Sequence, residues 1–551
     1  MIDTENNDNA ISNIFQQKYA KILNNKDCQG HNENFDERVN ALSNIENVHY
    51  ISFQEVDRSI SKLKNMNGPE GLHSNHFKYA PREFKHLIFL LLNSFMIHSF
   101  VPQNMLIGQI KPEIKDKFGK VNNSDNYRPV MSSCNLLKVF EYCMLPTFER
   151  FANLHDNQFG YRIGTSTLMC VNVVQEVINH YITNNTCVFS AFLDMRKAFD
   201  SVNHYTLIEK LMEIGISGNV ISVIKQIYFS QSCYTLYNKS LSGTNMIRNG
   251  IRQGGVLSGV LFNIYLDALI KRVNSSSYGC QLNMNSYAIV EYADDLVVLA
   301  PTKSALENLL NIVTDELRIL NFTLNPMKCK CIRFGIGKPS GAMNLSLEGA
   351  RIEEVYDFKY LGVTLTYNLR ITKDIERANT AFLKQFYGFF SKFSNANLYL
   401  KLRLFNMYCT SFYGSSLWTN YTGASKAAKA IRVSYHKAIK KIIGVPYWYG
   451  NHDTCNHVNF KTFENLVNLN VINYILQLKK SKSPCIRYMK TYMLYKSNIC
   501  REANKLVFEE YGFNNIIDND IDAMNACIYR KQISYVSNIP YDQILSRNSV
   551  G

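Results

Sequence analysis

Two adjacent aspartates inside an apolar run constrain the fold of this chain more than any other feature of its sequence. The run reads Ile289-Val290-Glu291-Tyr292-Ala293-Asp294-Asp295-Leu296-Val297-Val298-Leu299. Its β-branched and aromatic residues predict two strands buried on both faces and joined by a tight turn at Asp294 and Asp295. Acidic turns are common on solvated loop tips, but carboxylates held by a buried hairpin are costly unless a cation or a polar partner meets them. This pattern therefore favours a functional site.

A further carboxylate follows another predicted strand. Val188–Leu193 is largely apolar, and Asp194 comes directly after it, so Asp194 can face the hairpin. Asp200 is instead predicted to be the N-cap of the next helix. Carboxylates on rigid strands could share two Mg²⁺ ions about 3.5–4 Å apart, which activate an attacking hydroxyl and stabilise a leaving pyrophosphate. Mg²⁺ prefers few carboxylates plus substrate phosphate oxygens, which suits so small a set.

The charge of the chain is basic and unevenly distributed. The 551 residues carry a net charge of +15, and residues 370–450 hold 13 Lys and Arg against only Asp374 and Glu376. A basic segment interleaved with Tyr and Phe is typical of binding to a phosphate backbone, although a solvated helical face has a similar composition. No apolar run reaches the ~18 residues of a membrane span, and the polar N-terminus does not read as a signal peptide. We therefore expect a cytosolic or nuclear protein with no membrane partner.

The pattern of elements changes along the chain. Residues 51–105 predict helices broken by a turn at Asn67–Gly71, and residues 106–130 predict a loop or hairpin. Short apolar strands alternate with helices from 187 to 366, as in an α/β or α+β domain. Beyond residue 370 the pattern is almost wholly helical.

One C-terminal helix can be predicted in detail, between Ser425 and Ile443. Apolar residues follow the 3.6-residue period, a second face is basic, and Gly444 with Pro446 ends the helix. We expect this helix to pack on its apolar side and to offer cations on the other. The apolar set is Ile431, Tyr435, Ala438, Ile439 and Ile442, and the basic set is Lys429, Arg432, His436 and Lys440.

Eight short motifs occur in order between about residues 50 and 370. Three are similar to polymerase motifs A, B and C: Asp194–Asp200, Gly250–Ser258 and Tyr292–Asp295. The others look like an N-terminal extension motif, a fingers motif, a template-contacting loop, motif D and a primer grip: Gly68–Gly71, Asn126–Val130, Gln158–Thr167, Leu324–Lys328 and Phe358–Gly362. With all eight in order, the chain resembles the reverse transcriptases of non-LTR retrotransposons, LINE-like elements of the jockey type in particular.

The resemblance implies an α+β protein with the right-hand polymerase fold of fingers, palm and thumb, followed by a helical C-terminal extension. Residues 1–50 would be a linker or lead-in, and residues 51–370 the fingers and palm. Residues 371–450 would be the basic helical thumb, and residues 451–551 the extension. The implied activity is RNA-directed DNA synthesis, with an RNA template, a DNA primer and deoxynucleoside triphosphates as partners.

The resemblance also assigns roles to single residues. Asp194 and Asp294 would bind both Mg²⁺ ions, with Mn²⁺ possible in their place, and Asp295 would complete the carboxylate cluster. Two cations of the fingers would bind the triphosphate, and two motif B residues would line the nucleotide pocket. Lys328 could protonate the pyrophosphate, and the alternative is that it is an ordinary surface lysine. The triphosphate ligands would be Lys111 and Arg128, the pocket residues Gln253 and Gly254, and the primer grip Tyr360, Leu361 and Gly362.

Phe199 lies where this family keeps an aromatic gate under the sugar. A ring at that place would clash with a 2′-hydroxyl and so select deoxynucleotides. The alternative is an ordinary core phenylalanine beside the start of a helix. We favour the gate because Phe199 falls within motif A.

The chain departs from the family pattern in three ways, and other readings remain open. Gly259 replaces a usual proline, and we expect the polymerase to lack its endonuclease domain. The C-terminal region has no Cys-x-x-Cys knuckle, and the cluster of His452, Cys455 and His457 falls short of the four ligands of a zinc site. The main alternative is a catalytically dormant or domesticated RNA-binding relic of such an element. An RNA-dependent RNA polymerase is disfavoured by Phe199 and by the Tyr292-Ala293 pair, and a group II intron maturase by the lack of a C-terminal metal-nuclease signature.

Overall fold

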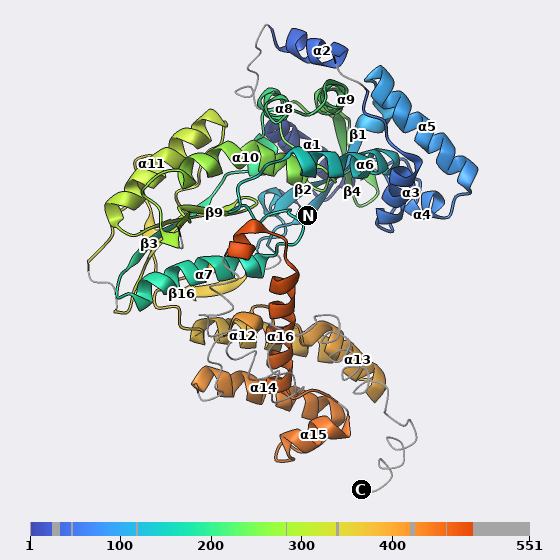
Figure 1. The fold of residues 1–551 in the computed structure, drawn as a ribbon. Helices are drawn as coiled ribbons and strands as arrows, with labels where there is room; N and C mark the ends of the chain where they lie inside the picture. The colour runs from blue at the N-terminus through green and yellow to red at the C-terminus, as the bar shows by residue number, and fades with distance from the viewer. Residues whose placement is uncertain are drawn as a thin grey trace.

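The computed structural model describes residues 2–24, 34–45, 48–116, 119–282, 284–337, 341–418, 425–458 and 460–488. Three parts are visible in Figure 1: a central sheet with its helices, a second sheet with helices around it, and a C-terminal group of helices. This mixture confirms the predicted α+β class, and the described residues beyond 371 are helical, as expected. Within the described ranges, no helix has the length and apolar character needed to cross a membrane.

The central sheet is covered by helices on both faces. Its strand order is β14-β11-β3-β10-β9, with β3 antiparallel to both β10 and β11. Along β10, Leu296 and Val298 join the core formed with α10 and α11, while Val297 and Leu299 join the core formed with α7. This alternation follows from the two-residue period of a strand. The bounds are β3 Val188–Asp194, β9 Ile289–Tyr292, β10 Asp295–Ala300, β11 Lys330–Phe334, β14 Glu353–Glu354, α7 Thr167–Thr183, α10 Ser258–Asn274 and α11 Lys303–Ile319.

The second sheet has the order β2-β1-β4-β5, with β6 paired to β4. β1 and β2 form the hairpin predicted for residues 106–130. α1 packs on this sheet, because Phe15 is fully buried with its ring 5.1 Å from that of Tyr127. Within the predicted lead-in, α1 is therefore attached to the sheet, whereas α2 packs on α9. The bounds are α1 Asp8–Leu23, β1 Ile107–Ile114, β2 Tyr127–Ser132, β4 Ser232–Tyr237, β5 Ser240–Leu241 and β6 Asn245–Met246.

Helices of the N-terminal half surround the second sheet and close one large core with α10 and α11. The turn predicted at Asn67–Gly71 lies between α3 and α4. There Glu70 accepts a hydrogen bond from the backbone N of Asn135 at 2.8 Å, which satisfies a free amide at the start of α6. The bounds are α2 Phe35–Ile45, α3 Phe53–Lys62, α4 Ser74–Lys78, α5 Arg82–His98, α6 Asn135–Phe151, α8 His204–Glu213 and α9 Gly218–Phe229.

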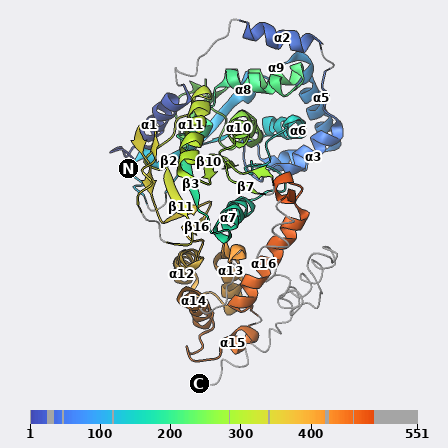
Figure 2. The ribbon, with the colours of Figure 1, turned by 60° about the vertical axis from the view of Figure 1, so that its left-hand side comes forward.

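The C-terminal helices pack around a separate aromatic core that includes Phe382, Phe405 and Tyr435. α16 then leaves this group and runs back to α7, as Figure 2 shows. Near its end Ser481 Oγ donates to the carbonyl of Gly164 at 2.6 Å. The bounds are α12 Thr372–Phe393, α13 Leu398–Cys409, α14 Lys426–Ile443, α15 Asn451–His457 and α16 Phe463–Lys480.

The helix predicted between Ser425 and Ile443 is α14, capped by Ser425 and ended by Gly444. Its apolar set is buried as expected, but the basic face is wrong in part. His436 and Lys440 are buried, and Lys440 Nζ donates to the carbonyl of Tyr447 at 3.0 Å. The error arises because α15, α16 and the 444–449 turn cover more of this helix than its apolar stripe predicts.

The remaining short elements connect these parts. They are the 3₁₀ helices η2 Gln103–Leu106, η3 Ser124–Asn126, η4 Ala198–Ser201 and η5 Ser415–Leu417, and the strands β7 Gln281–Leu282, β8 Asn285–Ser286, β12 Ser346–Leu347, β13 Ala350–Arg351, β15 Asp357–Tyr360 and β16 Val363–Thr366.

Candidate active site

The predicted hairpin is present as β9 and β10. Tyr292 pairs with Asp295 across a two-residue turn made of Ala293 and Asp294. Ala293 has φ +58°, the left-handed region that hairpin turns require and that a residue with a Cβ adopts at a cost. Both strands are buried, while Asp294 and Asp295 reach solvent at the tip. The turn thus presents two carboxylates at the edge of the sheet.

Asp194 lies directly opposite Asp295 in the register of β3 and β10. Directly opposed residues of an antiparallel pair share one face, with Cβ atoms about 4.5–5.5 Å apart. Lys328 Nζ lies 3.5 Å from Asp194 Oδ2, and both side chains are partly exposed. The structure therefore brings the three predicted aspartates and Lys328 to one place.

The surroundings of Asp294 and Asp295 disfavour the ionisation of both carboxyl groups. Burial and then the charges of Asp294 and Asp194 raise the pKa of Asp295 to about 6. Burial also raises the pKa of Asp294, and Asp194 adds to this effect, whereas the cations Arg128 and Lys328 oppose it. A cation bound between these groups would stabilise their charged forms.

The donor set at this edge consists of hard carboxylate oxygens, which suit Mg²⁺ or Mn²⁺. In the part of the chain that the structure describes, no group of three or more His, Cys, Asp or Glu side chains is arranged to hold a metal ion. Mg²⁺ commonly keeps water and substrate phosphate oxygens in its shell. The residues therefore fit a metal that is shared with a bound nucleotide, rather than one enclosed by protein alone.

One cation of the second sheet, Arg128, acts on the aspartates, and Lys111 is its neighbour on the same hairpin. In the β1–β2 register Lys111 faces Val130 and Glu113 faces Arg128, so Lys111 and Arg128 are diagonal neighbours on one face of the hairpin. The charge of Arg128 acts on Asp294. Sequence reasoning did not single out Lys138, which is 9% exposed and whose pKa is lowered mainly by burial. Its Nζ donates to Ser132 Oγ at 3.2 Å, so it holds the end of β2 and does not face the aspartates.

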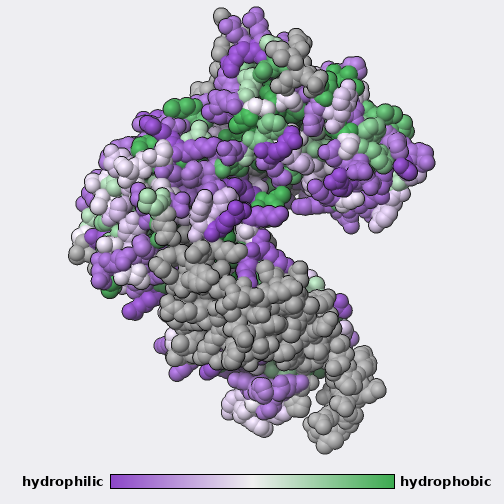
Figure 3. Space-filling view, viewed as in Figure 1, coloured by the Kyte–Doolittle hydropathy of each residue, from purple (hydrophilic) through white to green (hydrophobic). Residues whose placement is uncertain are grey.

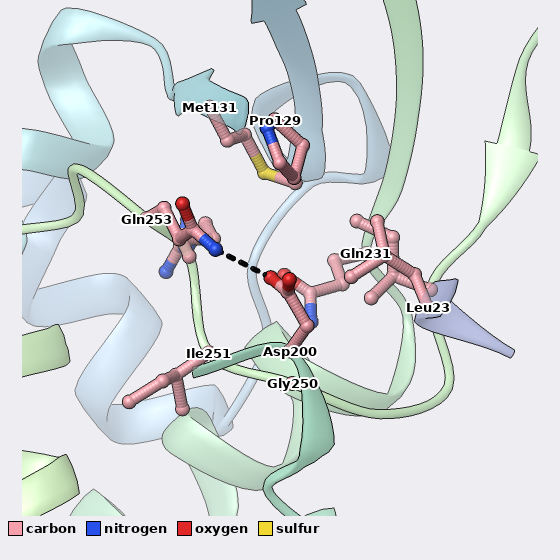
Figure 4. Close-up of a pocket in the computed structure, with 10 residues that line it drawn as sticks. Leu23, Pro129, Met131, Asp200, Gln231, Gly250, Ile251 and Gln253 are labelled. Atoms are coloured by element: carbon pink, nitrogen blue, oxygen red, sulfur yellow. Dashed lines mark hydrogen bonds between the residues drawn. The ribbon is translucent and has the colours of Figure 1, made fainter. Parts of the chain in front are cut away.

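Gln253 and Gly254 lie on the loop before α10, and Gln253 points toward Asp200 (Figure 4). Gln253 Nε2 donates to Asp200 Oδ1 at 2.7 Å, so this amide is turned toward a buried carboxylate. Burial raises the pKa of Asp200 to about 6, and the bond from Gln253 opposes that rise. Gly254 has φ +112°, and a Cβ there would come 3.0 Å from the carbonyl oxygen of Met131. Only glycine meets both constraints without strain.

The N-cap prediction for Asp200 is wrong. α8 begins at His204, and its cap is Asn203, whose Oδ1 accepts from the backbone N of Tyr205 and Thr206. A 3₁₀ turn at Ala198–Ser201 comes before the helix and rotates Asp200 inward. The carboxylate therefore meets the motif B loop instead of the helix end.

The motif B loop is also held from α6 by a residue that the sequence did not reveal. Glu141 is 1% exposed, and it accepts from Arg252 Nη2 at 2.5 Å and from the backbone N of Val256 at 2.7 Å. Glu141 lies within an amphipathic helical pattern, where a glutamate is ordinarily a surface residue.

Phe199 is half-buried beside the aspartates. Its ring stacks on that of Phe262, with centroids 4.5 Å apart and planes 9° apart, and Tyr161 meets it edge-on at 5.9 Å. The ring thus has a fixed plane and retains an open side.

The predicted primer-grip residues form the β15–β16 turn. Leu361 and Gly362 have φ of +44° and +84°. Tyr360 is 3% exposed, so only Leu361 and Gly362 could touch a partner. Tyr413, which follows α13 and which sequence reasoning missed, donates to the carbonyl of Leu361 at 2.9 Å. The C-terminal helices therefore support this turn.

On the face shown in Figure 3, the part that contains the two sheets is largely hydrophilic, with apolar side chains scattered among the polar ones.

Comparison with protein families finds one family that matches the segment containing this site. Residues 115–365 match the family described as reverse transcriptase (RNA-dependent DNA polymerase). The chain contains a reverse transcriptase domain. Asp194, Asp294, Phe199 and the motif B loop all lie within the matched segment. Reverse transcriptases as a family use divalent metal ions, in agreement with the donor set at the sheet edge.

Relatives of the reverse transcriptase domain come from mobile elements. The chain is 23% identical over 424 residues to the RNA-directed DNA polymerase from mobile element jockey of Drosophila melanogaster, which covers 73% of this chain and 45% of that protein. It is also 23% identical over 454 residues to the probable RNA-directed DNA polymerase from transposon BS of the same organism, covering 79% and 49%. The chain thus spans about half the length of these relatives. The predicted resemblance to LINE-like, non-LTR reverse transcriptases is confirmed.

Solved structures that resemble the chain include telomerases. A telomerase from Candida albicans in complex with a fragment of telomeric RNA is 10% identical, with a TM-score of 0.37, and covers 85% of this chain and 69% of that one. The reverse transcriptase domain has the right-hand polymerase fold that was predicted. The domain limits at 50, 370 and 450 and the role of each site residue stay predictions.

Proposed function

We propose that the protein is an RNA-directed DNA polymerase that copies an RNA template into cDNA, as part of a non-LTR retrotransposon. One observation carries the proposal: Asp194 and Asp295 face each other across β3 and β10, with Asp294 at the adjoining turn, inside a reverse transcriptase domain. The proposed partners are an RNA template, a DNA primer and deoxynucleoside triphosphates.

In this proposal Asp194 and Asp294 hold two Mg²⁺ ions, for which Mn²⁺ can substitute, and Asp295 completes the anionic edge. When bound, the ions would activate the primer 3′-hydroxyl and stabilise the pyrophosphate that leaves. The rigid register of β3 and β10 fixes the carboxylates in advance, so little reorganisation is needed at the moment of reaction.

The nucleotide would be held by groups on three sides of the aspartates. Arg128 presents a planar fork to the phosphates, and Lys111 adds a point charge on the same face of the β1–β2 hairpin. Phe199 would lie under C2′ of the sugar and exclude a ribose hydroxyl. Lys328, whose Nζ lies 3.5 Å from Asp194 Oδ2, would give a proton to the departing pyrophosphate.

The C-terminal helices would hold the template–primer duplex as a thumb. Their exposed lysines offer cations, and Tyr413 ties the turn at Leu361 and Gly362 to these helices. Binding through phosphates would be largely independent of sequence and would weaken with salt.

Primer extension on an RNA template with purified protein and Mg²⁺ tests the proposal. Asp294→Asn removes one metal ligand and its charge but keeps the size of the side chain. Extension should fall by at least about a thousandfold, since each ~1.4 kcal/mol of lost transition-state stabilisation costs tenfold. Binding of the RNA–DNA duplex, measured by fluorescence anisotropy, should stay largely intact.

The matched control is Asp315→Asn on the exposed face of α11, which should extend primers like the parent protein. Near-parental extension by Asp294→Asn would contradict the assignment of the carboxylates. A parent protein that binds the duplex but extends no primer would instead indicate a dormant RNA-binding relic.

A further inference from the structure

The loop between α6 and α7 delivers one aromatic side chain to the gate. Backbone hydrogen bonds fix the loop to β9, with Phe159 N donating to Glu291 O at 2.9 Å and Glu291 N donating to Asn157 O at 3.0 Å. On the other side Asn263 of α10 donates to the carbonyl of Gly160 at 2.6 Å. The next residue, Tyr161, is therefore held between the hairpin and α10.

Tyr161 has a strained backbone. Its φ is +53°, a region that residues with a Cβ seldom adopt and that clusters at functional sites. Its side chain is also 57% exposed, so burial of the ring does not account for the strain. Another interaction must therefore favour a tyrosine over a glycine at this position.

Gly259, the second residue of α10, provides a seat for the Tyr161 ring. A Cβ built on Gly259 would lie 2.4 Å from Tyr161 Cγ and 2.6 Å from Tyr161 Cβ, closer than any real contact. These are atoms near the backbone of Tyr161 and cannot move aside by a small rotation of the ring. The ring can occupy its place only because residue 259 has no side chain, which gives a physical reason for the departure from proline there.

The Tyr161 ring also touches Phe199. Its edge meets the Phe199 ring with centroids 5.9 Å apart and planes 74° apart, a favoured aromatic geometry. The opposite restraint on Phe199 is the stacked ring of Phe262, which is fully buried. Phe262 fixes the plane of the gate, and Tyr161 limits its movement within the site.

We propose that Tyr161 is a positioning residue for sugar discrimination: seated on Gly259, it holds the Phe199 ring where a ribonucleotide 2′-hydroxyl would clash. The proposal rests on the proposed function, because it takes Phe199 to lie under the sugar. It extends that function because it gives two further residues a part in the choice between deoxyribose and ribose. These are Tyr161, on the loop between α6 and α7, and Gly259, on α10. Without the Tyr161 ring, Phe199 can tilt away and admit ribose.

The test measures kcat/KM for dCTP and for CTP on one RNA template. Tyr161→Gly removes the ring and suits the left-handed backbone, so the variant should fold. It should lower the dCTP-to-CTP ratio by about two- to tenfold, the size expected for one aromatic contact. The ratio should fall because kcat/KM for CTP rises relative to that for dCTP, and a loss through template contact would lower both values alike and cancel in the ratio. Tyr161→Phe keeps the ring and should keep the parental ratio.

Gly259→Ala provides an independent route to the same effect, because the new methyl group displaces the ring. In the Tyr161→Gly background, Gly259→Ala should change the ratio no further, since the atoms it would strike are gone. The matched control is Gly388→Ala inside α12, where a Cβ meets nothing within 4 Å and the ratio should not change.

Two results separate the possible failures. If Phe199→Val lowers the ratio but Tyr161→Gly does not, Tyr161 is not a positioning residue, while the gate and the polymerase assignment stand. If neither variant changes the ratio in an active enzyme, Phe199 is no gate and the sugar-selection part of the proposed function is lost. An equal fall in kcat/KM for both nucleotides in Tyr161→Gly also overturns the inference and points to a role in template contact.

Discussion

The edge of the central sheet and the C-terminal helices use side chains in different ways. At the sheet edge each proposed functional group lies at a strand end or a turn, and the strand register fixes its neighbours, as with Asp194 and Asp295. On α14 the cations lie along a helix surface, and the packing of other helices decides which of them reach solvent. The first arrangement suits chemistry at one atom, and the second suits binding to a repeating backbone.

The two regions also differ in backbone strain. Turns of the sheet region hold non-glycine residues at positive φ next to proposed site residues: Tyr161, Lys197, Ala293 and Leu361. Among the described residues from 372 to 488, Phe412 alone of the non-glycine residues has a positive φ, in the connection beside Tyr413. Each such conformation costs on the order of 1–3 kcal/mol and persists where surrounding structure enforces it. The strained turns fix the positions of side chains at the sheet edge, whereas side chains on a helix surface can move more freely.

After the loss expected for Asp294→Asn, the next largest effect should follow from a change beside the sheet edge. Phe199→Val removes the ring but leaves the aspartates and the β1–β2 cations in place. The ratio of kcat/KM for dCTP over CTP on one RNA template should fall by about ten- to a hundredfold, because relief of each ~1.4 kcal/mol of steric clash is tenfold in rate. Activity with dCTP should remain, which also reports that the variant is folded. An unchanged ratio in an active variant would mean that Phe199 is a packing residue. Exact positioning of side chains would then distinguish the sheet edge from the helices less than proposed.

A smaller effect is expected on the helices. Lys429 and Lys437 are exposed on α14, and replacing both by Gln should weaken duplex binding and flatten the slope of log Kd against log salt by about 0.7–0.9 for each phosphate that is no longer neutralised. Lys440→Gln is the matched control, because that lysine is buried and hydrogen-bonded to Tyr447. It should lower thermal stability and leave the salt slope unchanged. The reverse pattern would mean that this surface of α14 does not meet nucleic acid.

The smallest effect concerns Glu176, on α7 beneath α16 where the two regions meet. Burial raises the pKa of Glu176 to about 7, and its Oε2 has no hydrogen-bond partner among the described residues. Because the folded protein holds this proton more tightly than the unfolded chain, stability should fall as pH rises from about 4.5 to about 7. Glu176→Gln should remove up to about 3 kcal/mol of this pH-dependent loss.

Thermal unfolding at pH 5 and pH 8 checks that prediction. The melting temperature of Glu176→Gln minus that of the parent should be a few degrees higher at pH 8 than at pH 5. The control is Glu307→Gln at an exposed position of α11, and its melting temperature should differ from that of the parent by the same amount at both pH values. A parallel shift for Glu176→Gln would mean that the carboxyl is ionised in both states, and that solvent enters between α7 and α16.

Local patterns predicted the sheet edge well. The apolar strands around Asp294 and Asp295, and the strand before Asp194, are continuous enough that strand ends and turns could be placed from the sequence. The order of the motifs then allowed these separate segments to be grouped from the sequence alone. The helical content beyond residue 370 followed from periodicity in the same way.

Contacts between distant segments were not predictable. Asp200 turns inward because a 3₁₀ turn comes before α8, and the capping rule could not distinguish it from Asn203. Lys440 is buried because of helices that follow it in the chain. The seat of Tyr161 on Gly259 joins segments about 100 residues apart, and neither residue alone indicates it.

The return of α16 to α7 has a consequence for how the protein is made. Val173 of α7 and Ile475 of α16 belong to one apolar core, although about 300 residues separate them. At about 5–20 residues per second, a ribosome needs roughly 15–60 s to bring the second half of that core into existence. Throughout that interval the apolar side of α7 lacks its final cover. The nascent chain therefore exposes an apolar surface on α7 until α16 has emerged from the ribosome and packed against it.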